Sequence, residues 1–293
     1  MPTANLLTFI SAKAASCIER MSGQALEQLL RRDRAVITVA LIAITGLAWA
    51  YVLWLADDMA MGGMDMTGFR MIPSGMGLMM PASAPWQPIE FIFMFVMWVV
   101  MMIGMMTPSA APMVLLYARV GRQAAVQGKP FANTYWFFGG YLLAWVTFAL
   151  AATLAQWAVQ RAALLTPMME SASAIFGSAL LITAGLYQWS PLKDACLRQC
   201  QAPLQFIQRH GGFRRGAKGS LGLGIRHGAY CVGCCWALMA LLFVGGVMNL
   251  LWIAVLTIFV LLEKVIPMGR TIARVAGGVL VASGGWLLAA VLI

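Results

Sequence analysis

Apolar residues form seven long, unbroken runs along the chain, and short polar stretches separate them. Each run is close to the roughly 20 residues that a helix needs to cross the hydrocarbon core of a bilayer. The runs show no alternation of apolar and polar positions, which favours helices over the strands of a membrane barrel. We therefore predict an all-α fold, a polytopic transmembrane helical bundle of about seven spans. The runs cover residues 36–55, 91–117, 134–158, 171–189, 229–247, 249–266 and 273–293.

Basic residues are distributed unevenly between these runs. Eighteen of the 20 Lys and Arg lie in the first 35 residues or in the connections after the second, fourth and sixth runs, and only Arg70 and Arg161 lie on the other side. Because cytoplasmic loops carry the excess of Lys and Arg, this split predicts an N-terminus inside the cell and a C-terminus outside. It also explains the net charge of +10, so we expect no nucleic-acid partner.

The composition indicates that lipid covers most of the protein. Hydrophobic residues make up 61% of the chain and charged residues only 10%, whereas a soluble domain carries about 25% charged residues. We predict a transmembrane domain over residues 36–293, preceded by a cytoplasmic amphipathic segment over 1–35. Two connections are long enough to have roles of their own, an outer Met-rich loop at 56–90 and a cytoplasmic Cys-containing loop at 190–228.

Methionine is concentrated between residues 59 and 113, where fifteen of the 22 Met residues lie. The first group is in the outer loop, in a stretch rich in Gly and Pro that does not favour a packed helix. Thioether sulfur is a soft ligand that selects Cu(I) over hard cations, so this loop is a candidate for metal capture. Adaptable packing is the alternative. The candidates in the loop are Met59, Met61, Met64 and Met66.

A second group of methionines follows the run at 91–117. At about 100° per residue, its members share one face of the predicted helix. The stripe ends near Pro108 and Pro112, which free backbone carbonyls that lipid cannot satisfy, so this part should be buried or line a cavity. We predict a sulfur-lined path, with ordinary helix packing as the alternative. The members are Met94, Met97, Met101 and Met105.

Five of the six cysteines fall on the predicted cytoplasmic side, where thiols stay reduced. One pair is spaced by four residues, and a second group, spaced by three and four, places an imidazole and three thiols on one helix face with a methionine one turn further. Thiolate and imidazole ligands suit Cu(I) or Zn(II). We predict one inner metal site. Its candidate ligands are Cys196, Cys200, His227, Cys231, Cys234, Cys235 and Met239.

Two other interpretations of these cysteines stay open, a thiol–disulfide relay and inert packing. A thiol–disulfide relay would need paired thiols on both sides of the bilayer, and the predicted outer half contains no cysteine. Glu263, near the inner end of the sixth run, is a candidate functional residue because an ionisable group at this depth is costly. An ion pair between Glu263 and Lys264 or a neighbouring Arg is the alternative of equal weight.

Four blocks of sequence together resemble a bacterial family of predicted metal-binding integral membrane proteins. The blocks are MWVVMMIGMMTPSAAPM, GLYQWSPLKDACLRQCQAP, HGAYCVGCCWALMALLFVGGVMN and the pair EK. They lie roughly within residues 94–264, which is most of the chain. The resemblance implies a multi-pass protein of the bacterial inner membrane with a metal site, and it implies no catalytic mechanism.

Our leading hypothesis is a membrane protein that handles copper(I) by collection, transfer or transport, with zinc as the other metal that its ligands suit. The outer methionines would collect the ion, the stripe would pass it inward and the cysteines would receive it. The expected partners are the lipid bilayer, a soft metal ion and a metallochaperone or metalloenzyme. A membrane thiol–disulfide oxidoreductase, or a scaffold or assembly factor for a metalloenzyme with a structural metal site, are the alternatives, and an enzyme is the less favoured class.

Overall fold

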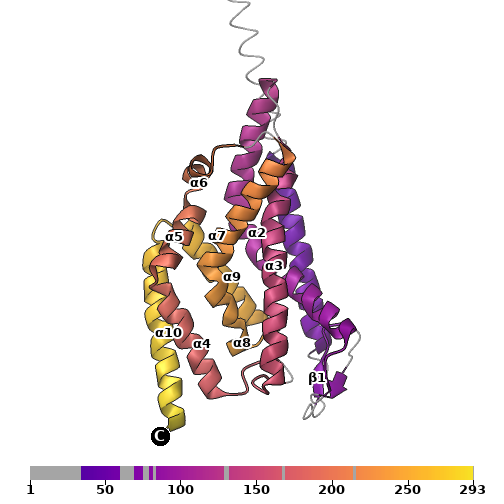
Figure 1. The fold of residues 1–293 in the computed structure, drawn as a ribbon, viewed down its shortest axis with the longest axis vertical. Coiled ribbons are helices and arrows are strands. Elements are labelled where there is room, and N and C mark those ends of the chain that lie inside the picture. The colour runs from indigo at the N-terminus through magenta and orange to yellow at the C-terminus, as the bar shows by residue number, and fades with distance from the viewer. Residues whose placement is uncertain are drawn as a thin grey trace, which may run out of the picture.

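The structure, a computed structural model, describes residues 34–59, 69–74, 79–81, 84–128, 132–166, 169–213 and 216–292. Nearly all of this part of the chain is helical, as predicted, and the helices form one elongated bundle (Figure 1). The exception is a small antiparallel hairpin of β1 (Phe69–Met71) and β2 (Met79–Pro81). The predicted N-terminal segment lies almost wholly outside the described residues.

Five of the predicted spans correspond to helices that are long and apolar enough to cross a membrane. The first predicted span ended at residue 55, but its helix continues to Met59, so the start of the predicted outer loop at residue 56 is helical. The helices are Arg34–Met59, α2 (Pro88–Val126), α3 (Thr134–Arg161), α7 (Ala217–Ala240) continued by α8 (Leu242–Gly245), and α10 (Gly269–Leu292).

The other two predicted spans are shorter helices, so the count of seven crossings is not confirmed. α4 (Ala174–Gln188) has 15 residues and α9 (Leu250–Val265) has 16. At about 1.5 Å per residue each is about 22–24 Å long, less than the ~30 Å hydrocarbon core. Capping explains the difference, because the side chains of Ser173 and Asn249 accept hydrogen bonds from the first helical turns and begin the helices inside the apolar runs.

The stretch at 190–228 is largely helical and not the loop that the sequence predicted. Ser190 caps α5 (Pro191–Gln201), and its Oγ accepts a hydrogen bond from the Lys193 backbone N–H. α6 (Pro203–Arg209) follows, and α7 begins at Ala217, so His227 lies well inside a helix. α6 and the C-terminal end of α10 lie towards opposite ends of the bundle (Figure 1).

Glycines allow the helix backbones to approach closely at two contacts. Between α4 and α10, a Cβ on Gly185 would stand 2.8 Å from the carbonyl oxygen of Gly277. Between α3 and α7, Cβ atoms on Gly140 and Gly224 would overlap the opposite backbone. Small residues are the usual means of close helix packing in membranes, where lipid removes the hydrophobic driving force between helices. The α3–α7 contact holds the cysteine-bearing helix against α3.

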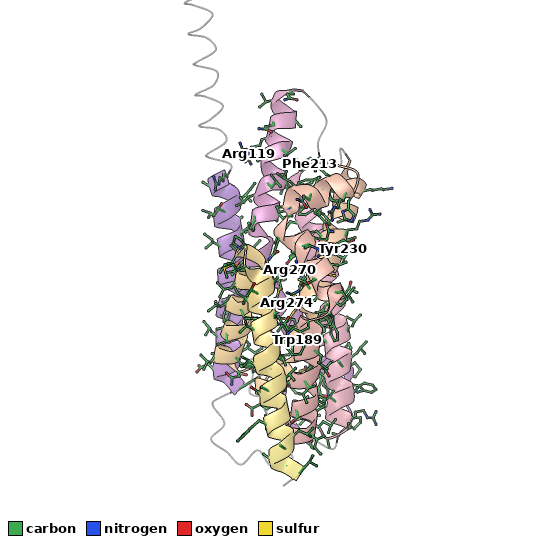
Figure 2. All side chains as sticks on the ribbon, turned by 90° about the vertical axis from the view of Figure 1, so that its left-hand side faces the viewer. Arg119, Trp189, Phe213, Tyr230, Arg270 and Arg274 are labelled. Carbon is green, nitrogen blue, oxygen red and sulfur yellow. The ribbon has the colours of Figure 1, made fainter. Side chains whose placement is uncertain are left out.

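An exposed ion pair also joins α5 to α10. Asp194 of α5 accepts from Arg270 at 2.6 Å and lies 3.7 Å from Arg274, both on α10. The indole N–H of Trp189 donates to the Arg274 carbonyl at 2.9 Å. Figure 2 labels Arg270, Arg274 and Trp189, the last of which ends α4 and lies beside α10. Together these contacts hold α5, and therefore its two cysteines, against the helical core.

Candidate metal centre

Cysteines from two helices meet inside the bundle. Cys231, Cys234 and Cys235 of α7 are at most 2% exposed. The Cys200 thiol of α5 lies close enough to the thiols of Cys231 and Cys234 for them to shift its pKa. These two thiols, together with burial, raise the pKa of the Cys200 thiol. The two cysteine groups that the sequence separates by a long connection are therefore neighbours.

The thiols do not yet point at one common centre. The Sγ atoms of Cys234 and Cys235 donate to the Cys231 carbonyl oxygen at 3.1 Å and 2.9 Å. Among the described residues, no group of three or more His, Cys, Asp or Glu side chains has the arrangement of a metal site. The thiols can be neighbours without forming a metal site, because they would converge on one ion only after rotating away from the backbone carbonyl. Metal ligation by these cysteines stays a prediction.

Lys264 lies beside these cysteines, although the sequence suggested it only as an ion-pair partner of Glu263. Its Nζ lies 2.8 Å from the Cys231 Sγ, 3.3 Å from the Ser109 Oγ and 4.0 Å from the Met106 Sδ. The side chain is buried, and a buried ammonium requires a nearby negative charge. A thiolate supplies that charge. We call Cys200, Cys231, Cys234, Cys235 and Lys264 the thiol cluster.

Glu263 pairs with a residue that the sequence did not suggest. Its two carboxylate oxygens each lie 2.9 Å from the Nζ of Lys193 on α5, and Gln188 of α4 contacts both side chains. Glu263 is therefore ion-paired, as one of the two alternatives had it, but its partner is Lys193 and not Lys264 or an Arg. Adjacent helical residues point about 100° apart, so Glu263 faces α4 and α5 while Lys264 faces the cysteines. The buried Glu263–Lys193 pair thus sets the position of Lys264.

Tyr141 of α3 forms another side of the thiol cluster, and the α2 segment that it contacts is followed by two prolines. The Tyr141 hydroxyl lies 3.0 Å from the Met106 carbonyl oxygen and 3.2 Å from the Cys231 Sγ. Pro108 and Pro112 lie inside α2, where they remove backbone donors. The Ser109 Oγ also donates to the Met106 carbonyl at 2.9 Å. The carbonyls left without a helical donor are those of Gly104 and Pro108, four residues before each proline.

His227 is buried near the thiol cluster but is not shown in contact with a thiol. Its ring packs among the rings of Phe137, Tyr141 and Phe206, with centroids 5.9, 5.8 and 5.1 Å away. Among the described residues, nothing hydrogen-bonds to its Nδ1. A buried imidazole nitrogen without a partner is uncommon. His227 lies one helical turn from Cys231, so its role as a ligand stays a prediction.

The remaining predicted inner ligands lie at the edges of the thiol cluster. Cys196 packs on α7, and its Sγ lies 2.9 Å from where a Cβ of Gly233 would stand. Burial and the nearby Cys234 raise the pKa of the Cys196 thiol. Met239 is buried on α7 one turn beyond Cys235. Neither residue is brought among the other thiols as closely as Cys200 is.

The methionine stripe of α2 faces the interior. All its predicted members are at most 2% exposed, and so are Met102, Met106 and Met113. Met59 is also 2% exposed, at the end of the first helix. Met61, Met64 and Met66 lie outside the described residues. The predicted members are Met94, Met97, Met101 and Met105.

Comparison with known proteins gives one family. The PpoB2 family model, described as a copper chaperone, matches residues 95–287, which is about two thirds of the chain. The chain belongs to this family. No curated protein and no solved structure matches it. The match runs from α2 to α10 and includes the whole thiol cluster. It indicates a copper-related role, and it agrees with the metal-related part of the resemblance drawn from the sequence.

Proposed function

We propose that this protein is a membrane-embedded copper chaperone that holds copper(I) on the thiol cluster and passes it to an acceptor metalloprotein. The observation that carries the proposal is the meeting of Cys200 from α5 with Cys231 and Cys234 from α7 beside the Lys264 ammonium. Thiolates are soft ligands and favour Cu(I). Chaperone activity needs bound metal that can leave, and ligands from two separate helices allow release when α5 moves relative to α7.

The charge of the thiol cluster supports copper(I) over zinc. A copper(I) ion bound by two thiolates carries one net negative charge, and Lys264 at 2.8 Å from Cys231 neutralises it. Zinc in a structural site takes four ligands in a tetrahedron, and four thiolates around zinc would leave a net negative charge even beside Lys264. Uncompensated charge in a buried site is costly. Zinc therefore fits this site less well than copper(I).

Five long apolar helices support insertion in a membrane, and the excess of basic residues on one side supports an N-terminus in the cytoplasm. For a bacterial protein this is the inner membrane. In this orientation the thiol cluster lies nearer the cytoplasmic end and the start of α2 lies at the outer end. The buried methionines of α2 connect the two ends and offer neutral thioethers for stepwise movement of the ion.

Two observations on the described residues weigh against the alternative functions. The five described cysteines are free and gather around α5 and α7, whereas a relay needs thiols at both membrane faces. A scaffold with a structural zinc site would need four ligands in a closed tetrahedron, which fits this site less well than copper(I) for the reason of charge given above.

The test is a copper(I) competition titration against a chromophoric chelator, with the full-length protein in detergent under anaerobic conditions. We expect the double variant Cys231→Ser/Cys234→Ser to lose at least about 100-fold in copper(I) affinity, because loss of direct ligands should exceed the 10–100-fold cost of losing a residue that only supports a ligand. Cys17→Ser, the same change far away in sequence, is the matched control. Equal copper(I) affinity of the double variant and the control would refute the proposal.

A further inference from the structure

A buried amide at the opposite end of α3 contacts two thioethers at once. Gln156 is fully buried, and its Nε2 donates to the Sδ of Met169 at 3.1 Å and to the Sδ of Met94 at 3.5 Å. Its Oε1 accepts from the indole N–H of Trp98 at 2.6 Å. Trp98 therefore fixes the orientation of the amide, with the nitrogen directed at the two sulfurs.

Thioether sulfur is a weak hydrogen-bond acceptor, so it is a poor partner for a buried amide. Burial of polar groups normally requires good hydrogen bonds, and oxygen acceptors would serve folding better. The pairing of one amide with two methionines is therefore not explained by stability alone. Both sulfurs present lone pairs to the same nitrogen, which is the arrangement that a soft cation between them would need.

Met169 reaches this position through an unusual backbone. It lies in the connection between α3 and α4, and its φ of 61° falls in the left-handed region, which residues other than Gly rarely adopt. Its N–H donates to the Thr166 carbonyl, and its carbonyl accepts from the Val247 N–H in the α8–α9 turn. Two connections thus hold Met169 inside the end of the bundle, and residues in strained conformations are concentrated at functional sites.

The sulfurs lie at one end of a continuous row of buried methionines. Met94 is twelve residues before Met106 on α2, or about 18 Å along the helix axis, and Met106 contacts Lys264 of the thiol cluster. Four further methionines between them are at most 2% exposed. On α3, Tyr141 contacts Cys231 of the thiol cluster and Gln156 contacts Met94 and Met169, so α3 runs between the same two sites. The thioethers are therefore placed where an ion could begin or end a path to the cysteines.

We propose that Met94 and Met169 form a second soft-cation site, with copper(I) or silver(I) held between the two sulfurs in place of the Gln156 amide hydrogens. We call these two residues the thioether pair. This inference rests on the proposed copper function and adds the point at which the ion enters or leaves. Gln156 is a competitor for the site, since an N–H dipole directed at the sulfurs occupies the position that the cation would take. That competition makes the site weak and exchangeable.

The experiment is a silver(I) titration of the full-length protein in detergent under reducing conditions, with the heat of binding measured by calorimetry. We expect two binding events of different affinity in the unchanged protein. Met94→Leu/Met169→Leu should weaken the weaker event by at least about tenfold and leave the stronger one. Met268→Leu, at an exposed methionine between α9 and α10, is the control and should change neither. Met and Leu are close in volume, and such swaps are well tolerated in cores.

The outcomes separate this inference from the proposed function. Loss of the stronger event in Cys231→Ser/Cys234→Ser, with the weaker event retained, supports two sites. If Met94→Leu/Met169→Leu leaves both events unchanged, the second site is refuted and the chaperone proposal stands. If the cysteine variant changes nothing, the chaperone proposal fails by itself. X-ray absorption of silver bound to the cysteine variant should show sulfur neighbours, and oxygen or nitrogen neighbours alone would refute the thioether pair.

Discussion

The thiol cluster and the thioether pair use sulfur in two different electrostatic settings. The thiol cluster is charged, and an ammonium at 2.8 Å faces the Cys231 sulfur. The thioether pair is neutral, and a carboxamide nitrogen faces the sulfurs of Met94 and Met169. In both regions a buried N–H donor occupies the side of the sulfur that a cation would use. The difference indicates that the thiols are suited to hold an ion and the thioethers to exchange one.

The strength of the donor explains this division. Removing Lys264 would leave a buried thiolate charge uncompensated, so this donor stabilises the ligands while the metal is absent. Removing the Gln156 amide would leave only neutral sulfurs, which are tolerated in an apolar core. The thiol cluster therefore depends on its neighbours for its charge balance, and the thioether pair does not. Three substitutions test this contrast.

The largest effect is expected from Glu263→Gln. It leaves the Lys193 ammonium buried without a countercharge, and breaking a buried ion pair costs about 3–5 kcal/mol. We expect the free energy of unfolding, measured by SDS titration of the protein in micelles, to fall by about 3 kcal/mol. Copper(I) affinity should fall as α9 loses its anchor, while the weaker silver(I) event should persist.

Asp194→Asn is the matched control for this change, since it also converts a carboxylate into an amide. Its partners Arg270 and Arg274 have side chains that are 44% and 61% exposed, and exposed ion pairs contribute about 0–1 kcal/mol. A loss of stability in Glu263→Gln no greater than in Asp194→Asn would mean that the buried pair does not anchor α9.

Lys264→Met should give the second-largest effect. Methionine keeps the length of the side chain but removes the charge, so a copper(I) bis-thiolate in the site would carry an uncompensated negative charge. We expect copper(I) affinity to fall about 100-fold, or about 2.7 kcal/mol, in the chelator competition. The exposed Lys218 of α7 provides the control, Lys218→Met. Unchanged copper(I) affinity in Lys264→Met would show that charge compensation is not needed.

The smallest effect is expected from Trp98→Phe. This change keeps the ring but removes the indole N–H that holds the Gln156 oxygen, a hydrogen bond worth about 1 kcal/mol. The amide can then turn away from the sulfurs, so the weaker silver(I) event should tighten by about fivefold in calorimetry. Trp145→Phe, at a second buried Trp that lies on α3, should have no such effect. A weakened event in Trp98→Phe would mean that the fixed amide helps binding instead of competing with it.

Local patterns in the sequence predicted much of this molecule. The apolar runs predicted the long helices, and the spacing of Cys231, Cys234 and Cys235 placed them on one face. The methionine stripe of α2 could be assigned to one face for the same reason. These features depend on the period of a single helix, which is set by backbone hydrogen bonding and is visible in the spacing of residues.

Contacts between helices could not be predicted in this way. That Cys200 lies beside Cys231, that Lys264 faces the thiols while Glu263 faces Lys193, and that Met169 meets Met94 over Gln156 all depend on which helix faces pack together. Close approach at glycines and the lengths of α4 and α9 decide that packing, and neither has a signature in local periodicity. The sequence alone determined an all-helical, sulfur-rich chain with soft-metal ligands, and only the tertiary structure decided which sulfurs meet and which buried donors face them.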